Sequence, residues 1–330
     1  MKLNRPPLVV AFELSERRKA IVADALAGAS AVVYLTELDQ ADRAEVLRNT
    51  GVLLTFNTSK ELRPGEAKLL EGVRLIQFMT AGVDFIPLRE LPEAAPVATN
   101  GGGYAESMAE HALAMALAAA KRLILEHENL KLGQFNQFKR NRILAGGLCG
   151  IFGFGGIGAA TARLMHGIGM RVHAINRRGR TDERVDWIGK PERLNELLEA
   201  ADVLLISAPL TRATYGLIGA AELGRMKDDA ILINLARGEI IQEGPLYDHL
   251  ATHPRFTACI DAWWIEPVRH GEFRVDKPFL DLPNVIASPH NSAQGAGAHD
   301  ISLRRAVENC RRALIGEAPL HVIGLDERLI

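Results

Sequence analysis

The sequence predicts an α/β protein with two doubly wound parallel sheets, each covered by helices. Three observations predict this fold class. Short runs rich in Val, Ile and Leu recur along the chain, and amphipathic segments with helical spacing separate most of them. Near the middle, one apolar strand leads into a glycine-rich turn that a helix follows directly. At 330 residues the chain is long enough for two domains, each with its own core.

The N-terminal third already shows the alternation of strand and helix that is typical of a parallel sheet. Five runs have the composition of buried strands: Leu8–Phe12, Ala31–Leu35, Val52–Phe56, Leu75–Met79 and Val97–Thr99. The spacing of apolar residues predicts helices over Ser15–Ala27, between the first two runs, and over Asp42–Asn49, between the second and third.

A glycine run, Asn100–Gly103, interrupts this pattern. The segment that follows, Tyr104–His127, is rich in Ala and Leu and predicts one long helix, so we expect the glycines to form a hinge before a second domain. The polar segment Lys131–Ile143 contains Phe135 and Phe138. It is either a disordered connection or an arm that wraps a partner subunit, because apolar residues in a polar loop usually cover something.

A G-x-G-x-x-G turn, Gly153–Gly158, follows a strand that begins at Leu148. After the turn come an Ala-rich helical segment, Ala159–Ile168, and a further strand, Arg171–Ile175. A strand, a tight turn and a helix N-terminus in series are what the pyrophosphate of a dinucleotide requires. A purely structural turn is the alternative. We predict dinucleotide binding by all six turn residues, Gly153, Phe154, Gly155, Gly156, Ile157 and Gly158.

The residues after Ile175 bear on the choice of nicotinamide cofactor. Enzymes that use NAD usually place an acid here to accept hydrogen bonds from the ribose 2′-OH. This chain reads Asn176-Arg177-Arg178 instead, and its next carboxylate is Asp182. Arginine binds phosphate, whereas a carboxylate repels it. We therefore predict that Asn176, Arg177 and Arg178 bind the cofactor and favour NADP(H). NAD(H) remains the alternative if the arginines are solvated surface.

The alternation resumes in the C-terminal half. Strands are expected at Val203–Ser207, Ala230–Leu235, Phe256–Asp261 and Val285–Ser288, and a helix is expected from about Ile301 to Ile315 after the break at Ser292–Gly297.

Three polar residues follow these strands: Arg237, Glu266 and His290. Taken singly, they could be a surface charge, an acid at a helix start and a loop histidine. Together they stand at the carboxyl edge of a parallel sheet, where ligands bind. Reduction of a carbonyl needs a proton donor, which an imidazolium can be; a carboxylate beside it favours that charged form, and a guanidinium can hold a substrate carboxylate. The trio therefore suits a 2-oxo acid and its 2-hydroxy acid.

Composition excludes several other classes. The net charge is −1, so no global field favours nucleic acid or an anionic membrane. The cysteines, Cys149, Cys259 and Cys310, form no C-x-x-C pair, and no metal-binding pattern is visible. The longest strictly apolar run, Ala112–Ala120, is too short to span a membrane, and the N-terminus shows no signal peptide. We expect a cytoplasmic protein.

These motifs together resemble the D-isomer-specific 2-hydroxyacid dehydrogenase family, which includes glyoxylate/hydroxypyruvate reductases, and the resemblance covers essentially the whole chain. The segments that carry it are Thr80-Ala81-Gly82-Val83-Asp84, Asn100 with Ala109-Glu110-His111, the Gly153–Gly158 turn, Ala208-Pro209-Leu210-Thr211, Asn234–Gly238, Asp261–Pro267 and Pro289-His290.

The resemblance implies a Rossmann nucleotide-binding domain, residues 103–292, inserted into a flavodoxin-like substrate domain, residues 1–102 and 293–330. It implies that Arg237 binds and polarises the substrate, His290 is the acid/base and Glu266 tunes it. It places the substrate carboxylate on the backbone amides of Ala81, Gly82 and Val83. Further cofactor-binding residues are expected at Met108, Ala208, Pro209, Leu235, Ala236 and Asp261. Family members are usually homodimers through the long helix.

Alternatives remain open. Glu266 argues against formate dehydrogenase, whose histidine is paired with a glutamine, and the chain length argues against the long phosphoglycerate dehydrogenases. A phosphite dehydrogenase shares the trio, and some relatives are nucleotide-sensing corepressors. A bulkier 2-oxo acid is a further alternative, because Trp263 and Trp264 put unusual bulk between Asp261 and Glu266. The interpretation that we prefer for these tryptophans is packing beneath the site.

Overall fold

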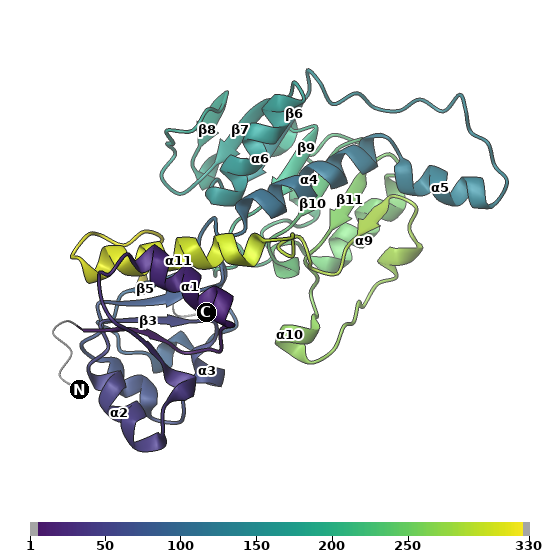
Figure 1. Cartoon of the computed structure of the whole chain (residues 1–330). Helices are drawn as coiled ribbons and strands as arrows, with labels where there is room; N and C mark the ends of the chain where they lie inside the picture. The colour runs from purple at the N-terminus through teal and green to yellow at the C-terminus, as the bar shows by residue number, and fades with distance from the viewer. Residues whose placement is uncertain (1–5, 326–330) are drawn as a thin grey trace. The chain divides into compact units, whose positions relative to one another are not determined.

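The computed structural model describes residues 6–325, which form two compact units (Figure 1). One comprises the described residues of Met1–Tyr104 and Ala296–Ile330, and the other is Ala105–Gly295. Each unit is an α/β layer structure with its own parallel sheet, as the sequence predicts.

The first unit contains a five-stranded sheet in the order β2-β1-β3-β4-β5, and every pairing in it is parallel. This is the strand order of flavodoxin-like folds. Its strands are β1 (Leu8–Val10), β2 (Val32–Tyr34), β3 (Val52–Thr55), β4 (Leu75–Phe78) and β5 (Val97–Ala98). Its helices are α1 (Glu16–Leu26), α2 (Gln40–Arg48), α3 (Thr58–Glu61) and α11 (Ala298–Leu314).

The two faces of this sheet are buried by different helices because successive residues of a strand point to opposite sides. Leu8 of β1 belongs to the core cluster that includes Leu303 of α11. Its neighbour Val9 belongs to the opposite cluster, with Leu47 of α2. Figure 1 shows α1 and α11 over one face and α2 at the other. The continuous apolar runs of the sequence follow from this burial on both faces.

The second unit contains a seven-stranded parallel sheet in the order β12-β11-β10-β9-β6-β7-β8. The order reverses between β6 and β9, as in Rossmann folds. The strands are β6 (Leu148–Phe152), β7 (Arg171–Ile175), β8 (Trp187–Gly189), β9 (Val203–Ile206), β10 (Ile231–Asn234), β11 (Thr257–Ile260) and β12 (Val285–Ala287). The helices are α4 (Ala105–Ala120), α5 (Leu123–Lys131), α6 (Gly156–Gly167), α7 (Leu194–Ala200), α8 (Ala220–Leu223), α9 (Glu243–Thr252) and α10 (Pro267–His270).

The single long helix predicted over Tyr104–His127 is wrong: α4 ends at Ala120, and α5 starts at Leu123. Arg122 between them has a left-handed backbone, with φ of 55°. A returning segment explains the break. The backbone N–H of Arg142 donates to the carbonyl of Ala120 over 2.9 Å, and this tertiary bond has no signature in the local sequence.

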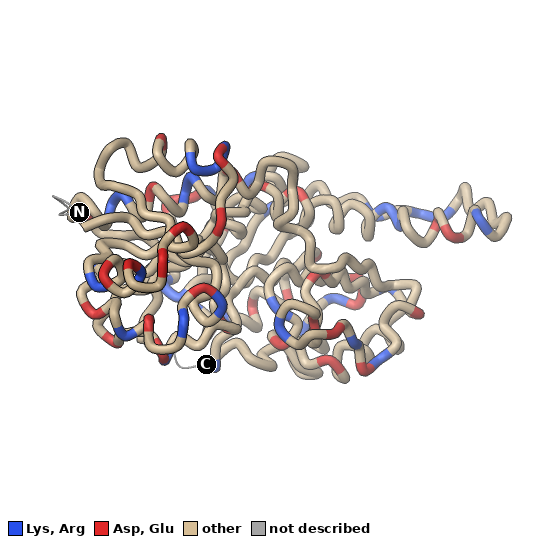
Figure 2. Tube along the Cα trace, turned by 60° about the horizontal axis from the view of Figure 1, so that its bottom comes forward, with Lys and Arg blue, Asp and Glu red and all other residues tan. Residues whose placement is uncertain are grey.

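The segment from α5 onward extends away from the sheet of its own unit (Figure 1). No residue of α5 is buried. Phe135 and Phe138 beyond it are 77% and 92% exposed, respectively. Residues 6–325 contain no helix with the length and apolar composition of a membrane span. Basic and acidic residues are interspersed along both units in Figure 2, in keeping with the small net charge.

Candidate active site

The glycine-rich turn has the geometry that a dinucleotide phosphate requires. Gly153 has φ of +100°, and a Cβ on it would lie 2.3 Å from the backbone nitrogen of Ala208. Only glycine fits such a close approach. A Cβ on Gly155 would meet no atom within 4 Å, so its backbone borders open space. The helix α6 begins at Gly156, earlier than expected, and its N-terminal N–H groups adjoin that space. These residues fit a pyrophosphate.

Asn176 shapes the turn after β7. Its Oδ1 accepts the backbone N–H groups of Arg178 and Gly179, over 3.0 and 2.7 Å, and its Nδ2 donates to the carbonyl of Arg180 over 3.0 Å. The side chains of Arg177 and Arg178 are exposed. The amide is therefore engaged mainly by its own turn, and the positive charge of this segment is carried by the arginines.

Arg237 lies in a loop that Asn234 braces at the end of β10. The Asn234 side chain donates to the carbonyl of Arg237 over 2.8 Å and accepts the N–H of Ala236 over 3.0 Å. Gly238 packs directly on the next loop, because a Cβ there would lie 2.4 Å from the carbonyl carbon of Trp263. The half-buried Arg237 is thus presented from a closely packed backbone.

Glu266 and His290 form a close pair. The Nδ1 atom of His290 lies 2.8 Å from each carboxylate oxygen of Glu266, and the backbone N–H of Trp263 donates to the same carboxylate over 2.7 Å. Burial alone would raise the pKa of Glu266, but the hydrogen bond and charge of His290, that N–H and the charge of Arg237 bring it below the ordinary value. The pair holds an ionised carboxylate against an imidazole.

His290 is itself in a left-handed conformation, with φ of 50°. A carboxylate holds the turn, because the fully buried Asp261 accepts the N–H groups of Asn291 and Ser292, over 3.1 and 3.3 Å. The Ser288 hydroxyl donates to Asp261 over 2.5 Å.

The other residues predicted to bind the cofactor or substrate also follow strands. Ala208 and Pro209 follow β9, Leu235 and Ala236 follow β10, and Asp261 follows β11; Met108 lies on α4. Because β6, β9, β10, β11 and β12 are consecutive neighbours in the sheet, their carboxyl ends bring the glycine turn, Arg237, Glu266 and His290 to one edge. Ala81, Gly82 and Val83 follow β4 in the first unit.

Sequence reasoning missed two residues that support this edge, Ser288 and Ser292. Ser288 bridges Asp261 and the Nε2 of His111, which lies 3.1 Å from the Ser288 hydroxyl. The side-chain hydroxyl of Ser292 is buried and, among the described residues, has no hydrogen-bond partner. An unpartnered buried hydroxyl at this edge is compatible with a site that receives a polar group of a cofactor. These positions follow strands as Arg237 does, but short hydroxyl side chains carry no distinctive sequence signal.

Trp263 is buried in the core of this unit and the half-buried Trp264 packs against that core, in agreement with the interpretation that we preferred. The indole N–H of Trp263 donates to the carbonyl of Ser288 over 2.9 Å, and that of Trp264 to the carbonyl of Ile241 over 2.7 Å. Both tryptophans therefore support the loops that carry the candidate catalytic residues.

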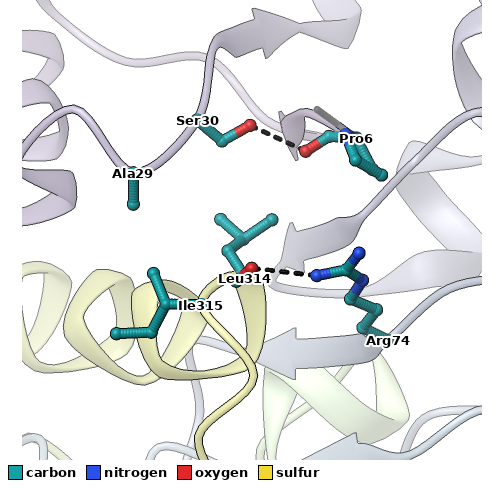
Figure 3. Close-up of a pocket in the computed structure, with 6 residues that line it drawn as sticks. All are labelled: Pro6, Ala29, Ser30, Arg74, Leu314 and Ile315. Atoms are coloured by element: carbon teal, nitrogen blue, oxygen red, sulfur yellow. Dashed lines mark hydrogen bonds between the residues drawn. The ribbon is translucent and has the colours of Figure 1, made fainter. Parts of the chain in front are cut away.

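A pocket of about 320 Å³ in the first unit lies elsewhere (Figure 3). Its lining residues are Pro6, Ala29, Ser30, Arg74, Leu314 and Ile315. Ser30 and Arg74 come just before β2 and β4, so the pocket lies at the amino ends of the strands. Ligands of parallel sheets bind at the opposite, carboxyl edge. The Arg74 guanidinium is already bonded to the carbonyl of Leu314 over 2.9 Å.

A dinucleotide turn with Arg, Glu and His on the same sheet edge defines the class of an NAD(P)-dependent oxidoreductase. Residues 113–292 match the family described as D-isomer specific 2-hydroxyacid dehydrogenase, NAD binding domain. The chain belongs to the D-isomer-specific 2-hydroxyacid dehydrogenase family.

Individual relatives carry more than one name. A D-3-phosphoglycerate dehydrogenase of Archaeoglobus fulgidus is 33% identical over 226 residues, which cover 68% of this chain and only 42% of that protein. A glyoxylate reductase of Korarchaeum cryptofilum is 29% identical over 272 residues, 80% of each chain. The fold matches that of a D-isomer specific 2-hydroxyacid dehydrogenase from Xanthobacter autotrophicus Py2, with a TM-score of 0.77, 23% identity and coverage of 97% of this chain and 98% of that one.

The pairing of Glu266 with His290 predicts a pH effect. Because its folded-state pKa is lowered, ionised Glu266 stabilises the fold above its unfolded-state pKa, and this contribution is lost as pH falls through the folded-state value. In His290→Ala, Glu266 stays buried but loses the hydrogen bond and charge of His290, so the pKa of Glu266 should rise. As the pH is lowered, the free energy of unfolding should therefore begin to fall at a higher pH than in the wild type. Carboxyl NMR titration and urea unfolding against pH measure both. An unchanged titration of Glu266 would contradict this account, and His253→Gln serves as the control.

Proposed function

We propose that this chain reduces a small 2-oxo acid of the glyoxylate or hydroxypyruvate type to its D-2-hydroxy acid and uses NADP(H). The observation that carries the proposal is the Glu266–His290 pair, 2.8 Å apart, on the same sheet edge as Arg237 and the glycine turn. We assign residues 103–292 to nucleotide binding, and residues 1–102 and 293–330 to substrate binding.

Each residue has a role that its chemistry supports. Arg237 binds the substrate carboxylate and polarises the adjacent carbonyl. The nicotinamide supplies the hydride when the cofactor is bound. The imidazolium of His290 gives a proton to the developing alkoxide, and Glu266 stabilises that imidazolium and orients its ring through Nδ1, which leaves Nε2 for the substrate. The backbone amides of Ala81, Gly82 and Val83 also receive the substrate carboxylate.

The remaining predicted residues would bind the other parts of the cofactor. Gly153–Gly158 would hold the pyrophosphate, and Asn176, Arg177 and Arg178 would hold the 2′-phosphate. The nicotinamide half would be lined by Ala208, Pro209, Leu235, Ala236, Met108 and Asp261.

The relatives support the reaction type more than the substrate. Both glyoxylate reductase and D-3-phosphoglycerate dehydrogenase occur among their names. Both names denote enzymes of small 2-oxo or 2-hydroxy acids, and the structure of this chain adds the acid/base pair and the guanidinium such substrates require. Discrimination among them is therefore a matter for kinetics.

The enzymatic role is tested by initial rates with glyoxylate, hydroxypyruvate and pyruvate, each with NADPH and NADH. We expect turnover, and we expect His290→Gln to lose at least about a hundredfold in kcat, the size of a general acid's contribution, while it still binds cofactor. His253→Gln, which precedes the amino end of β11 and so lies at the edge opposite the candidate site, should keep full activity. Wild-type turnover that persists in His290→Gln would refute the mechanism. Cofactor binding with no turnover on any 2-oxo acid would instead favour a nucleotide sensor.

The NADP(H) preference rests on the positive charge after β7, where no carboxylate precedes Asp182. Replacement of both Arg177 and Arg178 by Ser should raise KM for NADPH by about tenfold or more and leave KM for NADH nearly unchanged, because only NADPH carries the 2′-phosphate. Steady-state kinetics with both cofactors measure this. Arg184→Ser, also exposed and basic, is the matched control. Equal changes for both cofactors would assign the arginines to the surface.

We also propose a homodimer in which the exposed apolar arm around α5 covers a second copy. Phe135 and Phe138 are so exposed that they contribute little stability to an isolated monomer. The double variant Phe135→Ser/Phe138→Ser should shift the chain from dimer to monomer in sedimentation velocity. Tyr215→Ser, another exposed aromatic position, should leave the dimer intact. A wild-type monomer, or a double variant that stays dimeric, would contradict this assembly.

A further inference from the structure

An ion pair joins the two loops that carry Arg237 and Glu266. Glu239 lies in the 3-10 turn Gly238–Ile240 after β10, and Arg269 lies in α10 after β11. Nη2 of Arg269 is 2.7 Å from Oε1 of Glu239, and Nη1 is 3.0 Å from Oε2. Each side chain is only 15% exposed. The two parallel bonds make a fork that fixes direction as well as distance.

The chain positions of the pair place it close to the candidate catalytic groups. Glu239 comes two residues after Arg237, and Arg269 comes three residues after Glu266. The backbone N–H groups of Arg269 and His270 donate to the carbonyl of Glu266, over 3.2 and 2.8 Å. A displacement of Arg269 is therefore transmitted to Glu266 through a single helical turn.

A second contact between the same loops is made by backbone alone. Gly238 packs on the backbone of Trp263 and Trp264, where a Cβ would come within 2.6 Å. This contact limits how closely the loops approach each other. It provides no directional bond, so it does not prevent one loop from sliding along the other. Directional bonds come from the Trp264 indole N–H, which donates to the carbonyl of Ile241 over 2.7 Å, and from the Glu239–Arg269 fork, which alone of the two is charged and bidentate.

We propose that the Glu239–Arg269 ion pair is a positioning clamp that holds Arg237 at a fixed distance from the Glu266–His290 pair. The inference rests on the proposed function and deepens it. Arg237 must hold the substrate while His290 gives a proton to the same molecule, so their separation has to match the substrate. Misplacement of a reacting group by about 1 Å can cost on the order of a hundredfold in rate.

The pair is better suited to this task than an ordinary surface ion pair. Exposed pairs contribute little because water screens them and two long side chains lose freedom. Arg225–Glu199 is such a pair, with side chains 44% and 57% exposed and a 2.9 Å separation. It lies in the same unit and links no residue of the candidate site, which makes it the matched control.

The test compares Glu239→Gln and Arg269→Lys with Glu199→Gln. Loss of the clamp should lower kcat by about tenfold or more, while the cofactor Kd measured by fluorescence stays within about twofold; Arg269→Lys keeps the charge but not the planar fork and should also lose kcat. The charge-reversed double variant Glu239→Arg/Arg269→Glu should recover part of the loss. Glu199→Gln should match the wild type.

A double-mutant cycle separates positioning from general destabilisation. If the clamp acts through Glu266, adding Glu239→Gln to Glu266→Gln should cause little further loss in kcat, because that contribution is already gone. Fully additive losses, or a kcat in Glu239→Gln and Arg269→Lys equal to that of the wild type, would overturn the proposal.

A readout without turnover keeps this test distinct from that of the proposed function. The N–H of Trp263 donates to Glu266, so its hydrogen exchange reports the position of that carboxylate. We expect exchange at Trp263 to speed up in Glu239→Gln and to be unchanged in Glu199→Gln. If wild type shows no turnover, the proposed reaction fails while this measurement still decides the clamp. Unchanged exchange in Glu239→Gln would refute it.

Discussion

The buried carboxylate of Asp261 is the group on which the arrangement of the strand ends depends. A buried charge is tolerated only when it is well bonded, and Asp261 obtains its donors from the loop after β12: the hydroxyl of Ser288 and the N–H groups of Asn291 and Ser292. Those bonds hold the loop in a turn that includes His290 in a left-handed conformation, which costs a non-glycine residue roughly 1–2 kcal/mol. The carboxylate and the strained turn therefore require each other.

The turn also directs His290 toward Glu266, and a second constraint arises there. Glu266 is buried and stays ionised because His290, Arg237 and the N–H of Trp263 offset its loss of water. Removal of any of these leaves a carboxylate with too few partners. The candidate acid/base pair is thus held in place by electrostatics from β10, β11 and β12 together, which is why a parallel sheet with neighbouring strand ends is needed.

Much of this could be predicted from the sequence, and the reasons differ by element. Most strands were predictable because both faces of each sheet are covered, so β6 and β9 are continuous apolar runs. The short strand β8, Trp187–Gly189 at the edge of the second sheet, was not predicted. The end of α4 could not be predicted, because it depends on a hydrogen bond from Arg142, which lies far along the chain. Arg237, Glu266 and His290 stood out as polar residues after strands. The Glu239–Arg269 ion pair did not stand out, because an ion pair between two loops leaves no pattern in the local sequence.

The turn after β7 gives Asn176 a structural role in addition to the cofactor-binding role that we propose for it. Asn176 stands where an acid would discriminate against a 2′-phosphate, but its own side chain bonds the backbone of Arg178, Gly179 and Arg180. An aspartate here could accept the same two N–H groups but could not donate to the carbonyl of Arg180, and it would add a negative charge beside the arginines. The amide therefore keeps the turn closed and the local field positive at once. Any preference for a phosphorylated ribose then follows from the positive charge of the arginines. Asparagine closes the turn without adding a negative charge that would oppose it.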